Sequence, residues 1–89
     1  MLKIVPTGRF RKDYATVKRR GKDLNKLATI VNRLAGLEPL AVKHRDHALS
    51  GSWEGCRDCH VEPDWLLIYR VADDELHLIR TGSHSDLFG

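Results

Sequence analysis

The chain has 89 residues, of which 42% are hydrophobic and 30% are charged, and its formal net charge is +3. This length allows one domain, covering residues 1–89, with one sheet and a helix or two, and it excludes a separate cofactor-binding domain. No apolar run approaches the ~18 residues of a membrane span, and the apolar start is too short for a secretion signal. We therefore expect a cytoplasmic protein whose two cysteines stay reduced.

Positive charge is concentrated in the first half of the chain. Residues 1–45 contain twelve Lys or Arg against three acidic residues, whereas residues 46–89 contain three Arg against nine. Such an excess is typical of proteins that bind a polyanion, either nucleic acid or an acidic protein. It is equally typical of a solvated helix surface, so charge alone leaves both interpretations open.

The first predicted elements are a strand and a helix. Leu2–Val5 is rich in strand-forming residues and stops at Pro6, which is typical of an edge strand. Thr7 can cap the helix that follows. Apolar residues recur in this helix at the helical period and form one stripe, which consists of Phe10, Tyr14 and Val17.

A second helix follows after a short turn. Gly21 suits the left-handed conformation after a helix end, Asp23 can cap the next helix, and Gly36 ends it. Two helices joined by so short a turn are expected to form an antiparallel hairpin whose apolar face covers a sheet. The apolar residues that keep the helical period are Leu24, Leu27, Ala28, Val31, Leu34 and Ala35.

The second half of the chain is strand-like. After a connector over residues 37–45, short separators divide the apolar runs, so we expect an antiparallel meander and an α+β fold. Residues 66–69 are apolar on both faces, which is typical of a central strand, and residues 82–89 are expected to form a tail. The expected strands are His47–Gly51, Trp53–Glu62, Trp65–Val71 and Glu75–Thr81.

Candidate catalytic residues gather in two stretches, residues 46–65 and 80–88. Three histidines, His47, His60 and His84, lie in separate segments that a meander can bring together. Imidazole titrates near pH 6.5, so it can accept and donate protons at cellular pH. With a carboxylate and an arginine beside them, these histidines indicate general acid–base catalysis, and structural roles are the alternative. The carboxylate and the arginine are Asp64 and Arg80.

Arg80 precedes a Gly-Ser-His turn, where an arginine can hold a phosphate through two hydrogen bonds. An ion pair with an acidic residue is the alternative. Three aromatic residues, Trp53, Trp65 and Phe88, can stack on bases. We expect Trp53 in the core, which is the usual place of tryptophan in a small protein, and Phe88 exposed near the terminus.

A Cys-x-x-Cys-His pattern, typical of covalent haem attachment, begins at Cys56. Haem attachment needs an export signal and an axial partner, and the only methionine is the first residue, so we reject it. A zinc site at Cys56, Cys59 and His60 would need a second close ligand pair, for which His44 and His47 are the only candidates. We therefore expect ordinary strand cysteines, no metal and no cofactor.

At these residues the chain resembles the YafQ family of bacterial toxins, within the RelE superfamily. The similarity covers essentially the whole chain, and the spacing of three motifs is its specific part. The first two are residues 46–53, Asp-His-Ala-Leu-Ser-Gly-Ser-Trp, and residues 57–65, Arg-Asp-Cys-His-Val-Glu-Pro-Asp-Trp. The third is residues 80–84, Arg-Thr-Gly-Ser-His, followed by Leu87 and Phe88.

The resemblance implies a RelE-like small-ribonuclease fold, a twisted antiparallel β-sheet with two N-terminal helices packed on it. It also implies the toxin of a type II toxin–antitoxin system, an endoribonuclease that cuts mRNA on the ribosome. The partner would be a cognate antitoxin, expected to be a DinJ-like ribbon–helix–helix dimer. The site residues of the family fall on His47, His60, Asp64, Trp65, Arg80, His84 and Phe88.

The expected reaction is attack by a 2′-hydroxyl on the adjacent phosphorus, with departure of the 5′-oxygen. We expect Asp64 and His60 on the base side and His84 as the acid that protonates the leaving oxygen. Arg80 would stabilise the charge of the phosphorane, and His47 would position the phosphate. A non-enzymatic nucleic-acid or protein-binding module is the alternative, and such a module would not need this set of groups.

The basic residues of the predicted helices are expected to grip ribosomal RNA, so that a small chain can depend on the ribosome. The antitoxin is expected to cover this basic face, the site, or both. The residues expected to contact RNA are Arg9, Arg11, Arg19 and Arg20, together with Trp65 and Phe88.

Overall fold

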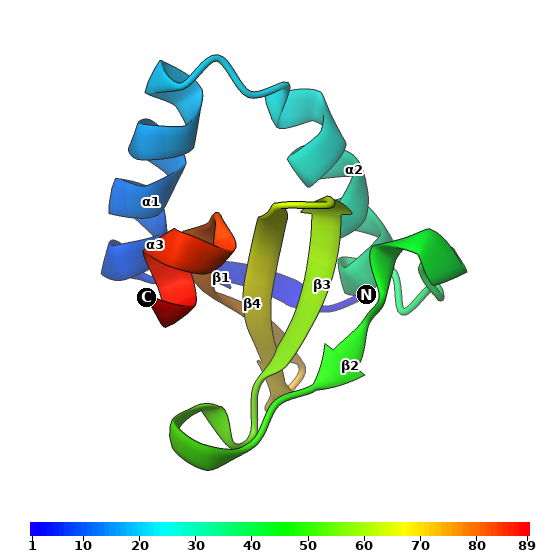
Figure 1. Ribbon diagram of the computed structural model, residues 1–89. Helices are drawn as coiled ribbons and strands as arrows, with labels where there is room; N and C mark the ends of the chain where they lie inside the picture. Colours follow the sequence, from blue (N-terminus) through cyan, green and yellow to red (C-terminus); the bar gives the residue numbers. More distant parts are fainter.

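Five strands form one sheet in the computed structural model, which describes all 89 residues (Figure 1). Their order across the sheet is β1-β5-β4-β3-β2, so the last four strands form the predicted meander of antiparallel neighbours. The first strand lies at the edge, as predicted, and runs parallel to β5. The bounds are β1 Lys3–Pro6, β2 His47–Ala48, β3 Arg57–Glu62, β4 Trp65–Ala72 and β5 Glu75–Gly82.

Two helices follow β1, α1 over Gly8–Arg19 and α2 over Leu24–Ala35, and both predicted caps are confirmed. Thr7 accepts a hydrogen bond from the amide of Phe10 and donates one to the carbonyl of Leu78 on β5, at 2.9 Å. This cap therefore also ties the helix start to the sheet.

Both helices end near a residue with a positive φ angle. Gly21, after α1, has φ +80° and takes the predicted left-handed conformation. Gly36 ends α2 as predicted, but its own φ is −80°, and the left-handed residue is Leu37, at φ +59°.

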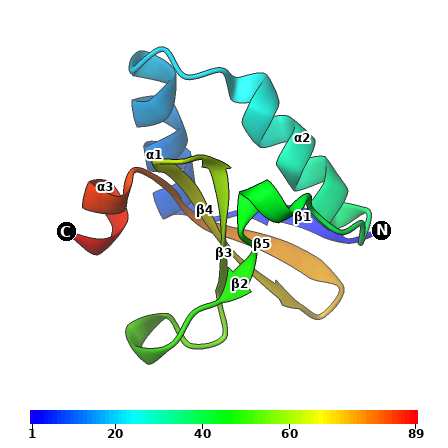
Figure 2. The ribbon, with the colours of Figure 1, turned by 45° about the vertical axis from the view of Figure 1, so that its right-hand side comes forward.

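The helices run in opposite directions from the turn that joins them, but they diverge instead of packing along their length (Figures 1 and 2). Helix α1 lies against β5, and α2 contacts β3. The predicted hairpin is therefore opened into a V, in which each helix packs on the sheet. Phe10 and Val17 of the stripe predicted for α1 are buried, whereas Tyr14 is 38% exposed. None of the helices is both long and apolar enough to cross a membrane.

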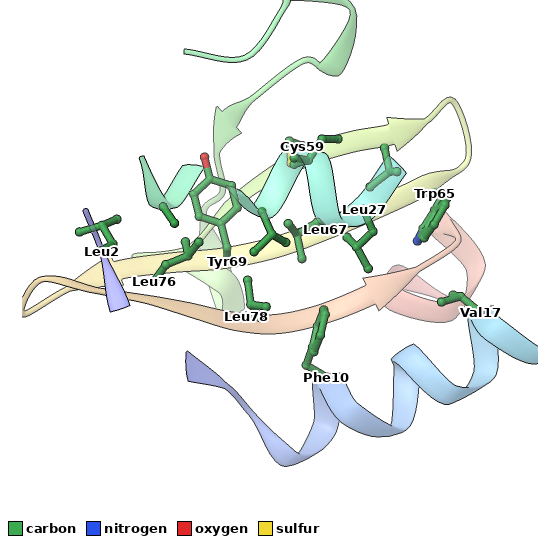
Figure 3. Packing of buried hydrophobic residues seen from close by; sticks show 14 residues of the cluster. Leu2, Phe10, Val17, Leu27, Cys59, Trp65, Leu67, Tyr69, Leu76 and Leu78 are labelled. Atoms are coloured by element: carbon green, nitrogen blue, oxygen red, sulfur yellow. The ribbon is translucent and has the colours of Figure 1, made fainter. Parts of the chain in front are cut away.

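The main core lies between these helices and the sheet (Figure 3). Strand β4 supplies its centre, since residues 66–69 are at most 2% exposed, which confirms the predicted central strand. Trp65, Leu67 and Tyr69 belong to the main core. Leu66 and Ile68 point to the other face, where a smaller cluster forms with Leu87.

Residues 47–56 form less strand than predicted. Strand β2 has only two residues, a 3₁₀ turn (η2) covers Gly51–Trp53, and β3 begins at Arg57. Gly51 and Gly55 adopt positive φ angles, +64° and +88°, that interrupt an extended run. Trp53 is half-buried against the smaller cluster, so it is not the fully buried core residue expected.

The predicted tail is instead a short helix, α3, over His84–Phe88. Ser83 caps it and forms a capping box with Asp86, in which each side chain accepts a hydrogen bond from the other residue's amide. The Ser-x-x-Asp spacing of this box is the signal in the sequence that marks the helix start. Gly82 lets the box close, because a Cβ there would lie 2.8 Å from a carboxylate oxygen of Asp86.

Replacing Leu67 by alanine should lower the free energy of unfolding by about 2–5 kcal/mol, because this side chain is fully buried between sheet and helices. Urea unfolding followed by circular dichroism measures the change. The matched control is Val71→Ala on the same strand, which is 50% exposed and should change it by less than about 1 kcal/mol. Equal losses of stability in the two variants would contradict the burial of Leu67 at the centre of the core.

Candidate active site

The face of the sheet opposite α1 and α2 carries the candidate catalytic residues. On β3, Asp58 and His60 lie two positions apart and face the same way, because side chains alternate along a strand. His47 of β2 is the direct partner of Asp58. Asp58 is in turn the partner of Ile68, which belongs to the smaller cluster away from the helices. Two of the three predicted histidines therefore stand on this face.

The third histidine, His84, is brought to the same face by α3. Its ring packs edge-on against the ring of His60, with centroids 5.5 Å apart and planes 66° apart. Asp64, in the turn between β3 and β4, holds it through Oδ1, which is 2.6 Å from Nδ1 and 2.9 Å from the backbone nitrogen of His84. The hydrogen bond from that backbone amide, followed by the ring, keeps the pKa of Asp64 below its usual value.

The pairing of Asp64 differs from the expectation. The sequence placed Asp64 with His60 on the base side, whereas the structure bonds it to His84. An ionised carboxylate can only accept hydrogen bonds, so Nδ1 of His84 carries the proton that it shares with Asp64. The other ring nitrogen, Nε2, is then available to a substrate.

His47 is held by the residues just before it. Its Nδ1 lies 2.7 Å from the carbonyl oxygen of Arg45, which has a left-handed backbone with φ +47°. Asp46, between them, accepts hydrogen bonds from the hydroxyl of Tyr69 and the guanidinium of Arg57. This segment is therefore fixed to the sheet, and it presents the exposed ring of His47 at the rim of the site.

Asp58 is a further candidate site residue, which was not among those predicted from the sequence. It is 4% exposed, and its Oδ1 is buried without a hydrogen-bond partner. Burial raises its pKa, and the nearby rings of His47, His60 and His84 act in the opposite direction. A buried carboxyl group thus lies on the face that carries His47 and His60. The signal in the sequence was its spacing from His60, since two residues on a strand share a face.

Arg80 is bound to Asp13 of α1, which corresponds to the ion-pair alternative. Nε lies 2.6 Å from Oδ2 and Nη2 lies 3.2 Å from Oδ1, and both side chains are largely buried, at 14% and 12% exposure. Asp13 also accepts a hydrogen bond from the amide of Thr81, at 3.2 Å. These contacts leave Nη1 as the guanidinium nitrogen without a partner in the chain. Arg80 is therefore held in place by Asp13 and can still bind a phosphate through Nη1.

The three aromatic candidates take different places. Trp65 is 1% exposed and donates a hydrogen bond from Nε1 to Thr81, at 2.9 Å, so it cannot stack on a base and its predicted RNA contact is corrected to a core role. Phe88 is 46% exposed, as expected. Its ring stands edge-on to Trp53, with centroids 6.3 Å apart, so Trp53 supports an exposed aromatic surface beside the site.

The basic residues of α1 do not form one uniform set. Arg9, Arg11 and Arg19 are exposed. Arg20 instead makes two hydrogen bonds to Asp86 of α3, and this guanidinium holds the pKa of the Asp86 carboxyl well below its usual range. Arg20 is thus committed to anchoring the helix that carries His84.

The cysteines do not approach a metal-binding arrangement. Cys59 lies in the main core, on the opposite face of β3 from His60, and burial raises the pKa of its thiol to about 12. Cys56 is free and half-buried beside the smaller cluster. No group of three or more His, Cys, Asp or Glu side chains is arranged to hold a metal ion.

Comparison with known proteins identifies the family. The model of the bacterial YafQ toxin of type II toxin–antitoxin systems matches residues 2–89. The chain belongs to the YafQ toxin family. It is 46% identical over 84 residues to the mRNA interferase toxin YafQ of Escherichia coli K12, covering 93% of this chain and 91% of that protein.

Solved structures of the family share the fold. YafQ from Escherichia coli BL21(DE3) matches with a TM-score of 0.94 and 43% identity, over all of both chains. A chain of the Escherichia coli DinJ–YafQ complex matches with a TM-score of 0.91 and 44% identity, also over all of both chains. The predicted α+β fold, with two N-terminal helices and a mostly antiparallel sheet, is therefore confirmed.

Replacing Asp13 by asparagine should weaken the growth arrest caused by this toxin by up to about 100-fold, because Arg80 loses the charged partner that fixes its position. The free energy of unfolding should fall by only about 1–3 kcal/mol, the usual worth of hydrogen bonds to a charged group. Titrated induction in living cells measures the arrest, and urea unfolding measures the stability.

Glu38→Gln is the control for this variant, since it breaks the exposed ion pair with Arg33 and should change neither quantity. The nuclear magnetic resonance signal of the Arg80 Nε–H group should shift in Asp13→Asn. An unshifted signal with full growth arrest would show that Asp13 does not position Arg80.

Proposed function

We propose that this chain is a ribosome-dependent endoribonuclease, an mRNA interferase, and the toxin of a toxin–antitoxin pair. The observation that carries the proposal is the contact of His60 with His84, beside the Asp64 bonded to His84 and on the same face of β3 as the buried Asp58. Two imidazoles at this separation can serve as base and acid across one phosphodiester. The name of the Escherichia coli relative, an mRNA interferase toxin, supports the same reaction.

The reaction requires one proton acceptor and one proton donor. The 2′-hydroxyl loses its proton to the base and its oxygen bonds to phosphorus, while the bond from phosphorus to the 5′-oxygen breaks. The leaving oxygen takes a proton from the acid, which yields a 2′,3′-cyclic phosphate and a 5′-hydroxyl. The net change consumes no water and needs no metal, cofactor or oxidant in this step.

His84 suits the acid role and His60 the base role. Asp64 holds Nδ1 of His84 and leaves Nε2 to donate, and its negative charge compensates that of the protonated ring, as in other carboxylate–histidine pairs. Asp58 lies two positions before His60 on the same face of β3. Its carboxyl can compensate the charge that appears when His60 accepts a proton.

The remaining site residues act on the phosphate and the base. Arg80, braced by Asp13, would stabilise the negative charge of the phosphorane through Nη1. His47, at the rim, would position the phosphate, and the exposed ring of Phe88 would stack on a base. Trp65 would act only through the core, by holding Thr81 next to Arg80.

Two macromolecular partners complete the proposal. Arg9, Arg11 and Arg19 of α1 would bind ribosomal RNA through its phosphates. A cognate antitoxin, DinJ-like and with a ribbon–helix–helix dimer, would neutralise the toxin, as the Escherichia coli relative is found in a complex with DinJ. A non-enzymatic binding module is less well supported, because it has no use for a histidine pair with one ring bonded to a carboxylate.

Replacing His84 by alanine should leave the chain folded but reduce mRNA cleavage on programmed ribosomes by about 10²–10⁴-fold, since it removes the proposed acid. Primer extension on the ribosome-bound message measures cleavage. The matched control is His77→Ala, because His77 pairs only with Glu75 at the far end of β5 and should keep the wild-type rate. Equal rates in the two variants would exclude His84 as the acid.

A message with a single 2′-deoxynucleotide at the cleavage position should remain uncut, because the proposed nucleophile is missing. The same message with the substitution two nucleotides away should be cut normally. Gel analysis of the two RNAs after incubation with toxin and ribosomes tests this. Cleavage of the first RNA would require water as the nucleophile and would overturn the proposed reaction.

A further inference from the structure

A groove of about 700 Å³ lies beside the candidate active site, between α2, β3 and the 3₁₀ turn η1 over Val42–His44. Seven of its ten lining residues carry a charged or polar side chain, and Ile30 and Val61 are hydrophobic. The lining residues that carry the argument are Lys26, Lys43, His44, Arg45, His60 and Glu62.

The groove carries uncompensated positive charge. Its one carboxylate, Glu62, already accepts hydrogen bonds from Lys22 at 3.0 Å and Lys26 at 2.8 Å, and these keep its pKa below the usual value. Lys43 and Arg45 are exposed and make no ion pair within the chain. An occupant with several negative charges therefore fits this groove better than a neutral one.

The groove adjoins the candidate active site at the edge of β3, where the backbone of residues 43–47 contacts both. His44 places Nδ1 2.7 Å from the carbonyl oxygen of His60, which lines the groove and also contacts His84. The carbonyl oxygen of Arg45 lies 2.7 Å from Nδ1 of His47. The two unpaired cations thus belong to the segment that holds two of the site histidines, so a strand that occupies the site can continue past them.

We propose that this groove binds the phosphates of the mRNA strand that leads away from the scissile bond, with Lys43 and Arg45 as the contacts. The proposal rests on the proposed function and names the path of the substrate. A protein segment fits less well, because the two cations belong to the segment that borders the candidate site, so the RNA substrate in that site reaches them without a second partner. Phosphates need only cations and hydrogen-bond donors.

The test is the double variant Lys43→Gln with Arg45→Gln, beside the control double variant Lys3→Gln with Arg70→Gln. The control removes two exposed, unpaired cations that lie outside the groove. The substrate is a ribosome programmed with a short message. The concentration of this ribosome–message complex that gives half the maximal cleavage rate should be roughly tenfold higher for the groove variant, and the maximal rate should be unchanged. The salt dependence of binding should become shallower by about 1.4, since each phosphate contact on a single strand contributes about 0.7.

A second arm uses a message truncated on either side of the cleavage position. Removing the nucleotides that occupy the groove should weaken the binding of the message to wild type as much as the double substitution does. In the double variant the same truncation should cause no further loss of binding. Additive losses with every truncation would assign the cations to ribosomal RNA and overturn the mRNA path. If the groove variant no longer binds the antitoxin but cuts the message as wild type does, the groove binds a protein and the mRNA path is overturned.

A binding arm separates this proposal from the proposed function. Fluorescence anisotropy with a labelled single-stranded RNA decamer at about 50 mM salt should show weaker binding by the groove variant than by the control. If wild type cuts no RNA, the proposed nuclease function fails, and this arm still decides whether the groove binds RNA. Equal affinities in the two double variants would overturn the groove proposal alone.

Discussion

Burial of β4 on both faces is the constraint on which the rest of the structure depends. Because residues 66–69 are enclosed by the main core on one face and by the smaller cluster on the other, the register of β3 beside them is fixed. Cys59 and Val61 then face the helices, and Asp58 and His60 face the site. A slip of one residue would exchange these two sets and leave no catalytic face.

The position of His84 depends on contacts made far from it in the sequence. A five-residue helix is too short to be stable alone, so α3 needs its capping box, the burial of Leu87 and the ion pair of Asp86 with Arg20. Asp64 then orients the imidazole. Charge pairs across the fold thus place the proposed acid, as Asp13 places the proposed phosphate-binding Arg80.

The contrast between a basic first half and an acidic second half has a partly internal explanation. Cations of the helices pair with carboxylates of the strands and of α3 at two places, where Arg20 meets Asp86 and where Lys22 and Lys26 meet Glu62. The cations that make no such pair include Arg11 and Arg19 of α1 and Lys43 and Arg45 near the site. Part of the charge pattern is therefore explained by ion pairs within the fold, which neither interpretation of the sequence had named, and the exposed cations remain available to a polyanion.

The sequence by itself determined the elements whose causes are local. The caps at Thr7 and Asp23, the turn at Gly21 and the central strand all follow from residues within a few positions of one another. The family resemblance also gave the fold and proposed the histidines of the site. Patterns of this kind failed at residues 47–56, where glycines interrupt the predicted strands, and at α3, where a capping box starts a helix within the predicted tail.

Only the tertiary structure decided which side chains meet. The bond between Asp64 and His84, the brace of Asp13 on Arg80 and the full burial of Trp65 join residues 16 to 67 positions apart. The burial of the Asp58 carboxyl, on the face that carries His60, needs the same long-range packing. Periodicity says which face a residue takes within its own element, but the partner across an interface is chosen by how the elements pack.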